Sequence, residues 1–236
     1  MGFKKITKSL KTDRKRWYDD ACGTAFALEL IGERWAILIM RELMFGPRRF
    51  GELRRDLPGV SANILTQRLG QLEQSRILRK RKLPPPASVQ VYELTEWGTE
   101  AEELVQMLGR WATRHPDHDP SLPLSAASIM MSFRTMFVPE RAGGMDARIG
   151  FRLGSDGFVV HIHDGTLDTT RMEPDDVDLL FKGTPSGLAA AVYGGGKFVD
   201  LEQAGILSVT GDQQLAEKFV TLFPLPEKLP ISDQGT

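Results

Sequence analysis

The segment at residues 60–78 constrains the fold most strongly, because its leucines recur at helical spacing with uncharged polar side chains between them. Ser61 is of a residue type that accepts a hydrogen bond from a free N–H group at a helix start, which predicts a helix from about Ala62. At about 100° per residue, the leucines share one face and the amides and hydroxyls lie opposite. The two sets are Leu65, Leu69 and Leu72 against Asn63, Gln67, Gly70 and Gln74, flanked by Thr66 and Gln71. A helix face that meets only water is normally charged, so we expect this polar face to meet a more specific partner.

The preceding segment, residues 46–59, predicts a second, shorter helix. Phe50, Leu53 and Leu57 recur at i, i+3 and i+7, and Pro58 and Gly59 then form a turn. Two short helices joined by a tight turn, the second with a polar outer face, form a helix-turn-helix. Amides and hydroxyls pair with base edges in the DNA major groove. The alternative is a surface helix that happens to be polar.

The segment that follows, residues 78–95, predicts a strand, a proline-containing break and a second strand. Its first strand carries four consecutive basic residues, Arg79 to Lys82. Such a hairpin beside a helix-turn-helix is a wing, and its cations suit phosphate contacts or entry into the minor groove.

Charge divides the chain into two halves. Residues 1–118 hold 21 Lys and Arg against 15 Asp and Glu, whereas residues 119–236 hold 9 against 16, so the net charges are +6 and −7. A chance difference in charge between two domains would explain this asymmetry. It would not explain why the basic half is also the half with the helix-turn-helix pattern. The basic half therefore favours a polyanionic partner, and the acidic half is not expected to contact DNA.

Residues 22–111 resemble the HxlR-type winged helix-turn-helix regulators, a branch close to the MarR regulators. The resemblance is carried, in order and spacing, by Cys22, "IGERW" at 31–35, "RRFGEL" at 48–53, "LPGVS" at 57–61, "LTQRL" at 65–69 and "LTEWG" at 94–98. It implies a transcription regulator that binds double-stranded DNA as a homodimer. The implied dimer interface comprises residues 19–31 and roughly 96–114.

We expect the two recognition helices of such a dimer to enter successive major grooves about 10 base pairs apart on an inverted repeat. Arg68 flanks the buried face, so its side chain could either contact a DNA phosphate or form an ion pair within the protein. The predicted DNA-binding residues are Ser61, Asn63, Thr66, Gln67, Arg68 and Gln71 on the helix and Arg79, Lys80, Arg81 and Lys82 on the wing.

Cys22 is the only cysteine, so no disulfide can form within the chain. The resemblance to relatives that use a cysteine in this region implies a thiol sensor, but a reactive thiol needs an exposed, electropositive setting. We therefore expect Cys22 to be a small buried residue. The basic arm from Lys4 to Arg16 either reaches DNA or is disordered. Neither a signal peptide nor a membrane-spanning stretch is found, which favours a cytoplasmic protein.

The length predicts a second unit, and residues 114–125 have the Pro- and Asp-rich composition of a linker. The predicted division is a winged helix-turn-helix domain at 1–115, a linker at 116–126 and a second domain at 127–236. In the second domain, a helix precedes strands in "ARIGFRLG", "GFVVHIHDGTLDTTR" and "VDLLFKG". A helix in "TPSGLAAAVYGG", a strand in "GILSVTGD" and an end helix in "QQLAEKFVTLFP" follow. This order indicates an α+β sheet with helices on one face.

The same segments, over residues 127 to about 225, resemble the sterol carrier protein type 2-like domains. This resemblance implies an apolar tunnel between sheet and helices that holds lipids or other hydrophobic molecules, and a role in effector sensing or dimer support. The candidate lining residues, which could equally be ordinary core, are Phe133, Met136, Phe137, Phe158, Ile162, Phe219, Leu222 and Phe223.

We expect no metal, no cofactor and no enzymatic activity. His161 and His163 alternate on one strand, but two histidines without a third ligand are typical of an exposed strand face. "GGGK" at 194–197 lacks the spacing of a phosphate-binding loop. The predicted function is a homodimeric regulator that responds to a hydrophobic small molecule in the second domain. The alternative is a lipid carrier or sensor in which the winged helix serves mainly dimerisation.

Overall fold

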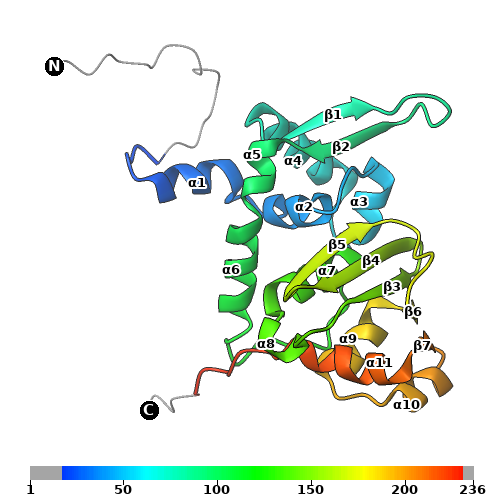
Figure 1. The fold of residues 1–236 in the computed structure, drawn as a ribbon. Coiled ribbons are helices and arrows are strands. Elements are labelled where there is room, and N and C mark those ends of the chain that lie inside the picture. The colour runs from blue at the N-terminus through cyan, green and yellow to red at the C-terminus, as the bar shows by residue number, and fades with distance from the viewer. Residues whose placement is uncertain (1–17, 231–236) are drawn as a thin grey trace.

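The computed structural model of the chain describes residues 18–230, which form an N-terminal unit of helices with one hairpin and a C-terminal unit built on a sheet (Figure 1). The N-terminal elements are α1 (Gly23–Ile31), α2 (Ala36–Leu43), α3 (Phe50–Asp56), α4 (Ala62–Gln74), β1 (Leu78–Lys82), β2 (Gln90–Leu94), α5 (Glu96–Glu100) and α6 (Glu102–Ala112). The predicted helix, turn, helix and wing are thus present as α3, α4 and the antiparallel β1–β2 pair.

The segment 96–114 of the implied dimer interface contains two helices, because α5 and α6 are separated at Ala101. Thr95 caps α5, its hydroxyl accepting from the N–H of Gly98 at 3.0 Å. Gly98 lies so close to the residue before β1 that a Cβ atom on it would come within 2.0 Å of the carbonyl oxygen of Ile77. Only glycine allows this approach, which fixes α5 against the base of the wing.

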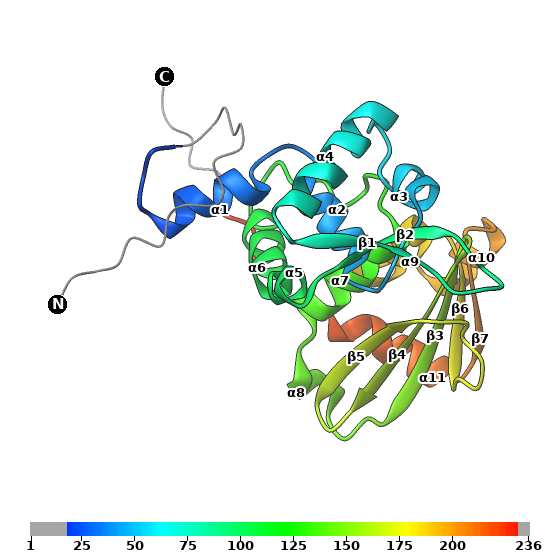
Figure 2. The ribbon, with the colours of Figure 1, turned by 90° about the horizontal axis from the view of Figure 1, so that it is seen from above.

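The C-terminal unit is a five-stranded sheet with helices on one face (Figure 2). Its elements are α7 (Ala126–Met136), α8 (Pro139–Ala142), β3 (Ala147–Leu153), β4 (Asp156–His163), β5 (Thr166–Arg171), β6 (Leu179–Gly183), α9 (Pro185–Tyr193), α10 (Phe198–Gln203), β7 (Leu207–Gly211), α11 (Gln213–Phe219) and a 3-10 turn at Val220–Leu222. The strand order is β5-β4-β3-β6-β7, with β3 and β6 parallel and the other neighbours antiparallel.

Side chains alternate between the two faces along β4, and Phe158, Val160 and Ile162 are fully buried. Their face of the sheet packs on α7, α9 and α11. His161 and His163 point to the opposite face and are partly exposed, pairing with Asp146 and Asp168 at 2.9 and 3.0 Å. The α+β arrangement is therefore confirmed, whereas the short helices α8 and α10 were not predicted from the sequence.

Helix α7 joins the two units, because it packs on the sheet and also against α2 and α6. Arg134 on α7 donates to Glu102 of α6 and lies with its guanidinium carbon 4.5 Å from the ring centre of Phe45. Phe45 in turn meets Phe158 of β4 edge to face, with ring centres 5.5 Å apart. The units thus share packed side chains, so the division at 116–126 remains a prediction. No helix within the described range is long and apolar enough to cross a membrane.

Candidate nucleic-acid interface

The turn between α3 and α4 is built from local hydrogen bonds. At the start of α3, the N–H of Arg49 donates to Glu52 Oε2 at 2.7 Å. After α3 the chain passes through Gly59, whose φ of +91° is a conformation that favours glycine. Ser61 then caps α4 by accepting from the N–H of Ile64 at 3.2 Å. The predicted cap residue and the predicted turn are both confirmed.

Helix α4 turns its uncharged polar face outward. Leu65, Leu69 and Leu72 are at most 1% exposed and anchor the helix on the core. Four of the predicted DNA-binding residues are exposed on the helix or at its cap, and Figure 2 shows α4 clear of the C-terminal unit. These are Ser61, Asn63, Thr66 and Gln67. The helix therefore presents amides and hydroxyls on its outer surface.

Arg68 lies inward from this exposed face. Its guanidinium donates to Glu33 Oε2 at 2.7 Å and to the carbonyl oxygen of Arg34 at 3.0 Å, and it also donates to the side chain of Gln71. Its side chain is 12% exposed. Of the two alternatives for Arg68, the structure supports the internal ion pair. Gln71, predicted to contact DNA, has its side-chain oxygen occupied by the same guanidinium.

The wing is basic, but most of its charge is paired. Glu93 on β2 accepts from Arg79 Nε at 2.7 Å and from Arg81 Nε at 2.9 Å, and Lys80 pairs with Glu73 of α4 at 2.9 Å. Lys82 is exposed and has no ion-pair partner between residues 18 and 230. Burial would raise the pKa of the Glu93 carboxyl, but the hydrogen bonds from the two arginines lower it. Sequence reasoning found the four cations and missed the carboxylate that holds two of them.

The HxlR-like helix-turn-helix family model matches residues 30–120, which contain the helix-turn-helix and the wing. The chain is 40% identical over 86 residues to the HTH-type transcriptional regulator YodB of Bacillus subtilis, covering 36% of this chain and 77% of that relative. It is 34% identical over 91 residues to the uncharacterized HTH-type transcriptional regulator YtcD of the same organism, covering 37% and 70%.

The chain belongs to the HxlR-like helix-turn-helix family. Its N-terminal unit is that of an HxlR-type transcription regulator. A solved structure of reduced YodB from B. subtilis is similar at 35% identity and a TM-score of 0.38, covering 42% of this chain and all of that one. The family match ends at residue 120, before α7.

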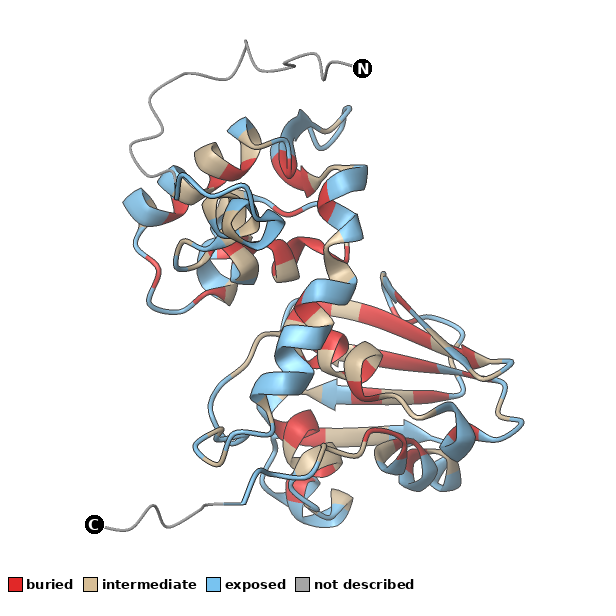
Figure 3. Ribbon diagram, turned by 90° about the vertical axis from the view of Figure 1, so that its left-hand side faces the viewer, coloured by how far each residue is buried: buried red, intermediate tan, exposed pale blue. Residues whose placement is uncertain are grey.

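The HxlR-like unit carries an apolar surface on α1 and α6. Helix α1 has no buried residue, although four of its nine residues are Phe, Leu or Ile. On α6, Met107 and Trp111 are 70% and 74% exposed. Both helices lie on one side of the molecule, and Figure 3 shows the exposed side of α6. A nine-residue helix is marginal in water without packing, so this surface has the character of an interface.

Cys22 lies at the start of α1 and is exposed, so the expectation that it is buried is wrong. Cys22 is exposed because α1 projects from the rest of its own chain (Figure 1). The backbone N–H groups of Ala25 and Thr24 lower the pKa of the thiol. The basic arm from Lys4 to Arg16 lies outside the described residues.

The side chains predicted to line a tunnel lie together as packed core. Phe133 stacks on Phe223 with ring centres 4.4 Å apart and meets Phe219 edge to face at 5.4 Å. Of the eight predicted residues only Phe137 is partly exposed, and the others are at most 3% exposed. This packing favours the core alternative for these side chains. Within residues 18–230, no cluster of three or more His, Cys, Asp or Glu side chains is placed to hold a metal ion.

Proposed function

We propose that this HxlR-like protein is a homodimeric regulator that reads an inverted-repeat operator with α4 and contacts phosphates with the wing. The observation that carries the proposal is the exposed, uncharged polar face of α4, with Asn63, Thr66 and Gln67 beside a basic hairpin. Amides and hydroxyls discriminate between base edges, and cations on a neighbouring hairpin supply affinity that does not depend on sequence.

Homodimerisation is supported by the apolar surface on α1 and α6. The two α4 helices of a dimer would enter successive major grooves, so operator binding by α4 would depend on the dimer that α1 and α6 form.

We further propose that a hydrophobic small molecule held by the C-terminal unit changes the affinity for DNA. The support is that the C-terminal unit packs directly against the helix-turn-helix unit, through α7 on α2 and α6. A ligand acts in this way only if it binds the DNA-competent and incompetent arrangements with different affinity.

The test is fluorescence anisotropy with the full chain and labelled duplex from upstream of its own gene, against a scrambled duplex, at two salt concentrations. We expect selective binding with a steep salt dependence. Gln67→Ala should reduce the preference for the operator, whereas Arg81→Ala and Lys82→Ala should weaken binding to both duplexes equally. Absence of selectivity on any upstream fragment, with weak salt dependence, would favour the carrier alternative.

A further inference from the structure

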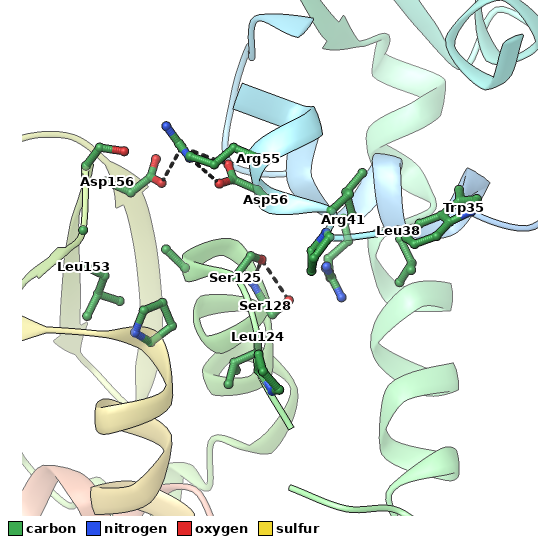
Figure 4. A pocket seen from close by; sticks show the side chains of 17 residues that line it. Trp35, Leu38, Arg41, Arg55, Asp56, Leu124, Ser125, Ser128, Leu153 and Asp156 are labelled. Atoms are coloured by element: carbon green, nitrogen blue, oxygen red, sulfur yellow. Dashed lines mark hydrogen bonds and ion pairs between the residues drawn. The ribbon is translucent and has the colours of Figure 1, made fainter. Parts of the chain in front are cut away.

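A cleft of about 500 Å³ lies between the two units (Figure 4). One wall comes from α2 and the turn of the helix-turn-helix, and the other from the segment before α7, the β3–β4 turn and the start of α9. The apolar lining comprises Trp35, Leu38 and Pro58 on the first wall and Leu124, Leu153 and Pro185 on the second. Its size lies within the range of small-molecule sites, roughly 300–1,000 Å³.

The polar lining of the cleft belongs to a network of ion pairs. Asp56 and Asp156 line the cleft, but Asp156 accepts from Arg48 and Arg55 at 2.6 and 3.3 Å and also accepts from Arg171. Arg48 and Arg55 also pair with Asp56. Glu52 also pairs with Arg48 at 3.8 Å, so these three guanidinium groups are matched by three carboxylates. Nε and Nη2 of Arg171 are buried without a hydrogen-bond partner in the described part of the chain.

Two arginines on the cleft wall, Arg41 and Arg55, have N–H groups that make no hydrogen bond within residues 18–230. Arg41 donates to Glu42 through Nε and Nη2, and Arg55 donates to Asp56 and Asp156 through the same two atoms. Within residues 18–230, neither Nη1 group makes a hydrogen bond. A guanidinium has five N–H donors, and such donors bind an anion with charge-assisted hydrogen bonds. Figure 4 shows Arg41 reaching from α2 toward the segment that holds Leu124.

The cleft is also connected to the recognition helix. Trp35 has a φ of +80°, which is unusual for a large side chain, and such strained residues cluster at ligand sites and switch regions. A Cβ atom on Gly59 of the turn would lie 3.7 Å from the Trp35 ring. The two residues before Trp35, Glu33 and Arg34, are the ones that hold Arg68 of α4. A molecule that displaces Trp35 would therefore disturb both the turn before α4 and the contacts that hold Arg68 in the middle of α4.

We infer that this cleft binds an organic anion with an apolar body, and that its occupation changes the affinity of α4 for DNA. The apolar lining takes the body of the molecule, and Arg41 and Arg55 take the acid group. This inference rests on the proposed function and gives it a site, at the surface that the C-terminal unit shares with the helix-turn-helix.

The test uses the full chain with 1-anilinonaphthalene-8-sulfonate, an aromatic sulfonate whose fluorescence rises on binding, and N-phenyl-1-naphthylamine, which lacks the sulfonate. We expect saturable binding of the sulfonate at one site per chain and at least tenfold weaker binding of the neutral compound. Leu38→Glu, at a position 38% exposed, should weaken sulfonate binding at least tenfold, and Leu38→Gln less than threefold. Val199→Glu, on α10 outside the cleft and 62% exposed, should leave it unchanged.

Ser155→Trp, at an exposed position of the β3–β4 turn, fills the cleft from the other wall and should also abolish binding. It replaces Leu38→Glu if that variant does not fold. Saturating sulfonate should change the affinity for operator DNA at least fivefold in the parent and not in Leu38→Glu. Equal binding of both compounds, or sulfonate binding that survives both cleft variants, would overturn the inference. If the unmodified chain shows no selective DNA binding, the proposed function is refuted instead.

Discussion

Arg48, just before α3, donates from Nη1 to Oδ1 of Asp156, the first residue of β4, over 2.6 Å. The two residues are 5% and 8% exposed, and 108 positions separate them in the chain. Burial would lower the pKa of Arg48, but its bonds to Asp156 and Asp56 raise it. A buried ion pair therefore ties the entry of the helix-turn-helix to the sheet of the C-terminal unit.

Asp156→Asn should lower the free energy of unfolding by about 3 kcal/mol, because breaking a buried pair from one side leaves guanidinium groups buried without their counter-charge. Urea denaturation followed by circular dichroism measures the loss. Arg152→Met is the matched control, because it breaks a pair with Glu173 that is 42% and 71% exposed. That variant should lose less than about 1 kcal/mol. Equal losses from the two variants would contradict a structural role for the Arg48 pair.

Glu93→Gln should strengthen binding to any duplex, because Glu93 holds Arg79 and Arg81 at 2.7 and 2.9 Å and competes with phosphates for them. We expect a several-fold rise in affinity at low salt. The slope of log affinity against log salt should steepen by about 1 to 2, since each added phosphate contact contributes about 0.9. Anisotropy titrations over a salt series measure both quantities.

The control for this prediction is Glu173→Gln, which removes a carboxylate from the C-terminal unit and should change neither quantity. An unchanged salt slope in Glu93→Gln would mean that the two arginines do not reach phosphate. In that case, Lys80 and Lys82 would be the remaining candidates among the four basic wing residues.

Local patterns predict the helix-turn-helix well because its features are short-range. Ser61 caps α4 within three residues, and the leucine spacing follows from the helix period alone. The same holds for Phe158, Val160 and Ile162, whose alternation follows from the strand period. Such features need no knowledge of the tertiary fold.

What the sequence could not predict depends on contacts between distant segments. The pairing of Arg48 with Asp156 joins residues on different units, and no periodicity marks either residue. The exposure of Cys22 depends on α1 projecting from its own chain. The cleft is likewise invisible in the sequence, because Leu38 and Leu153 line opposite walls of one cleft only when the two units pack.

Trp111→Glu should dissociate the dimer. Trp111 is 74% exposed on α6, and a glutamate buried at an apolar interface would be an unpaired charge. We expect the dimer dissociation constant to rise at least about 100-fold, which corresponds to about 2.7 kcal/mol. Sedimentation velocity measures the dissociation constant. Val199→Glu is the matched control, since Val199 is 62% exposed on the C-terminal unit. Dissociation in the control, or an intact dimer in Trp111→Glu, would place the interface elsewhere.

Glu42→Gln should stabilise the protein in a pH-dependent way. Glu42 on α2 is 1% exposed, and burial raises the pKa of its carboxyl above 4.5, despite the opposing effects of Arg41 and Ser125. The folded state therefore favours the neutral acid. The contribution of this preference to the free energy of unfolding is fully present below the pKa that Glu42 has in the unfolded chain. It is lost as the pH rises through the higher pKa of Glu42 in the folded state. A glutamine stays neutral at every pH and can still accept the hydrogen bond from Ser125.

The melting temperatures of Glu42→Gln and the parent should accordingly agree near pH 4 and separate toward pH 8, with the variant higher. A gain of 1 kcal/mol corresponds to roughly 2–4 °C for a chain of this size. Glu217→Gln, at an exposed position of α11, should shift the melting temperature equally at both pH values. If Glu42→Gln instead melts lower than the parent at pH 8, the ionised carboxylate stabilises the fold. The pairing with Arg41 would then outweigh the cost of burying the charge.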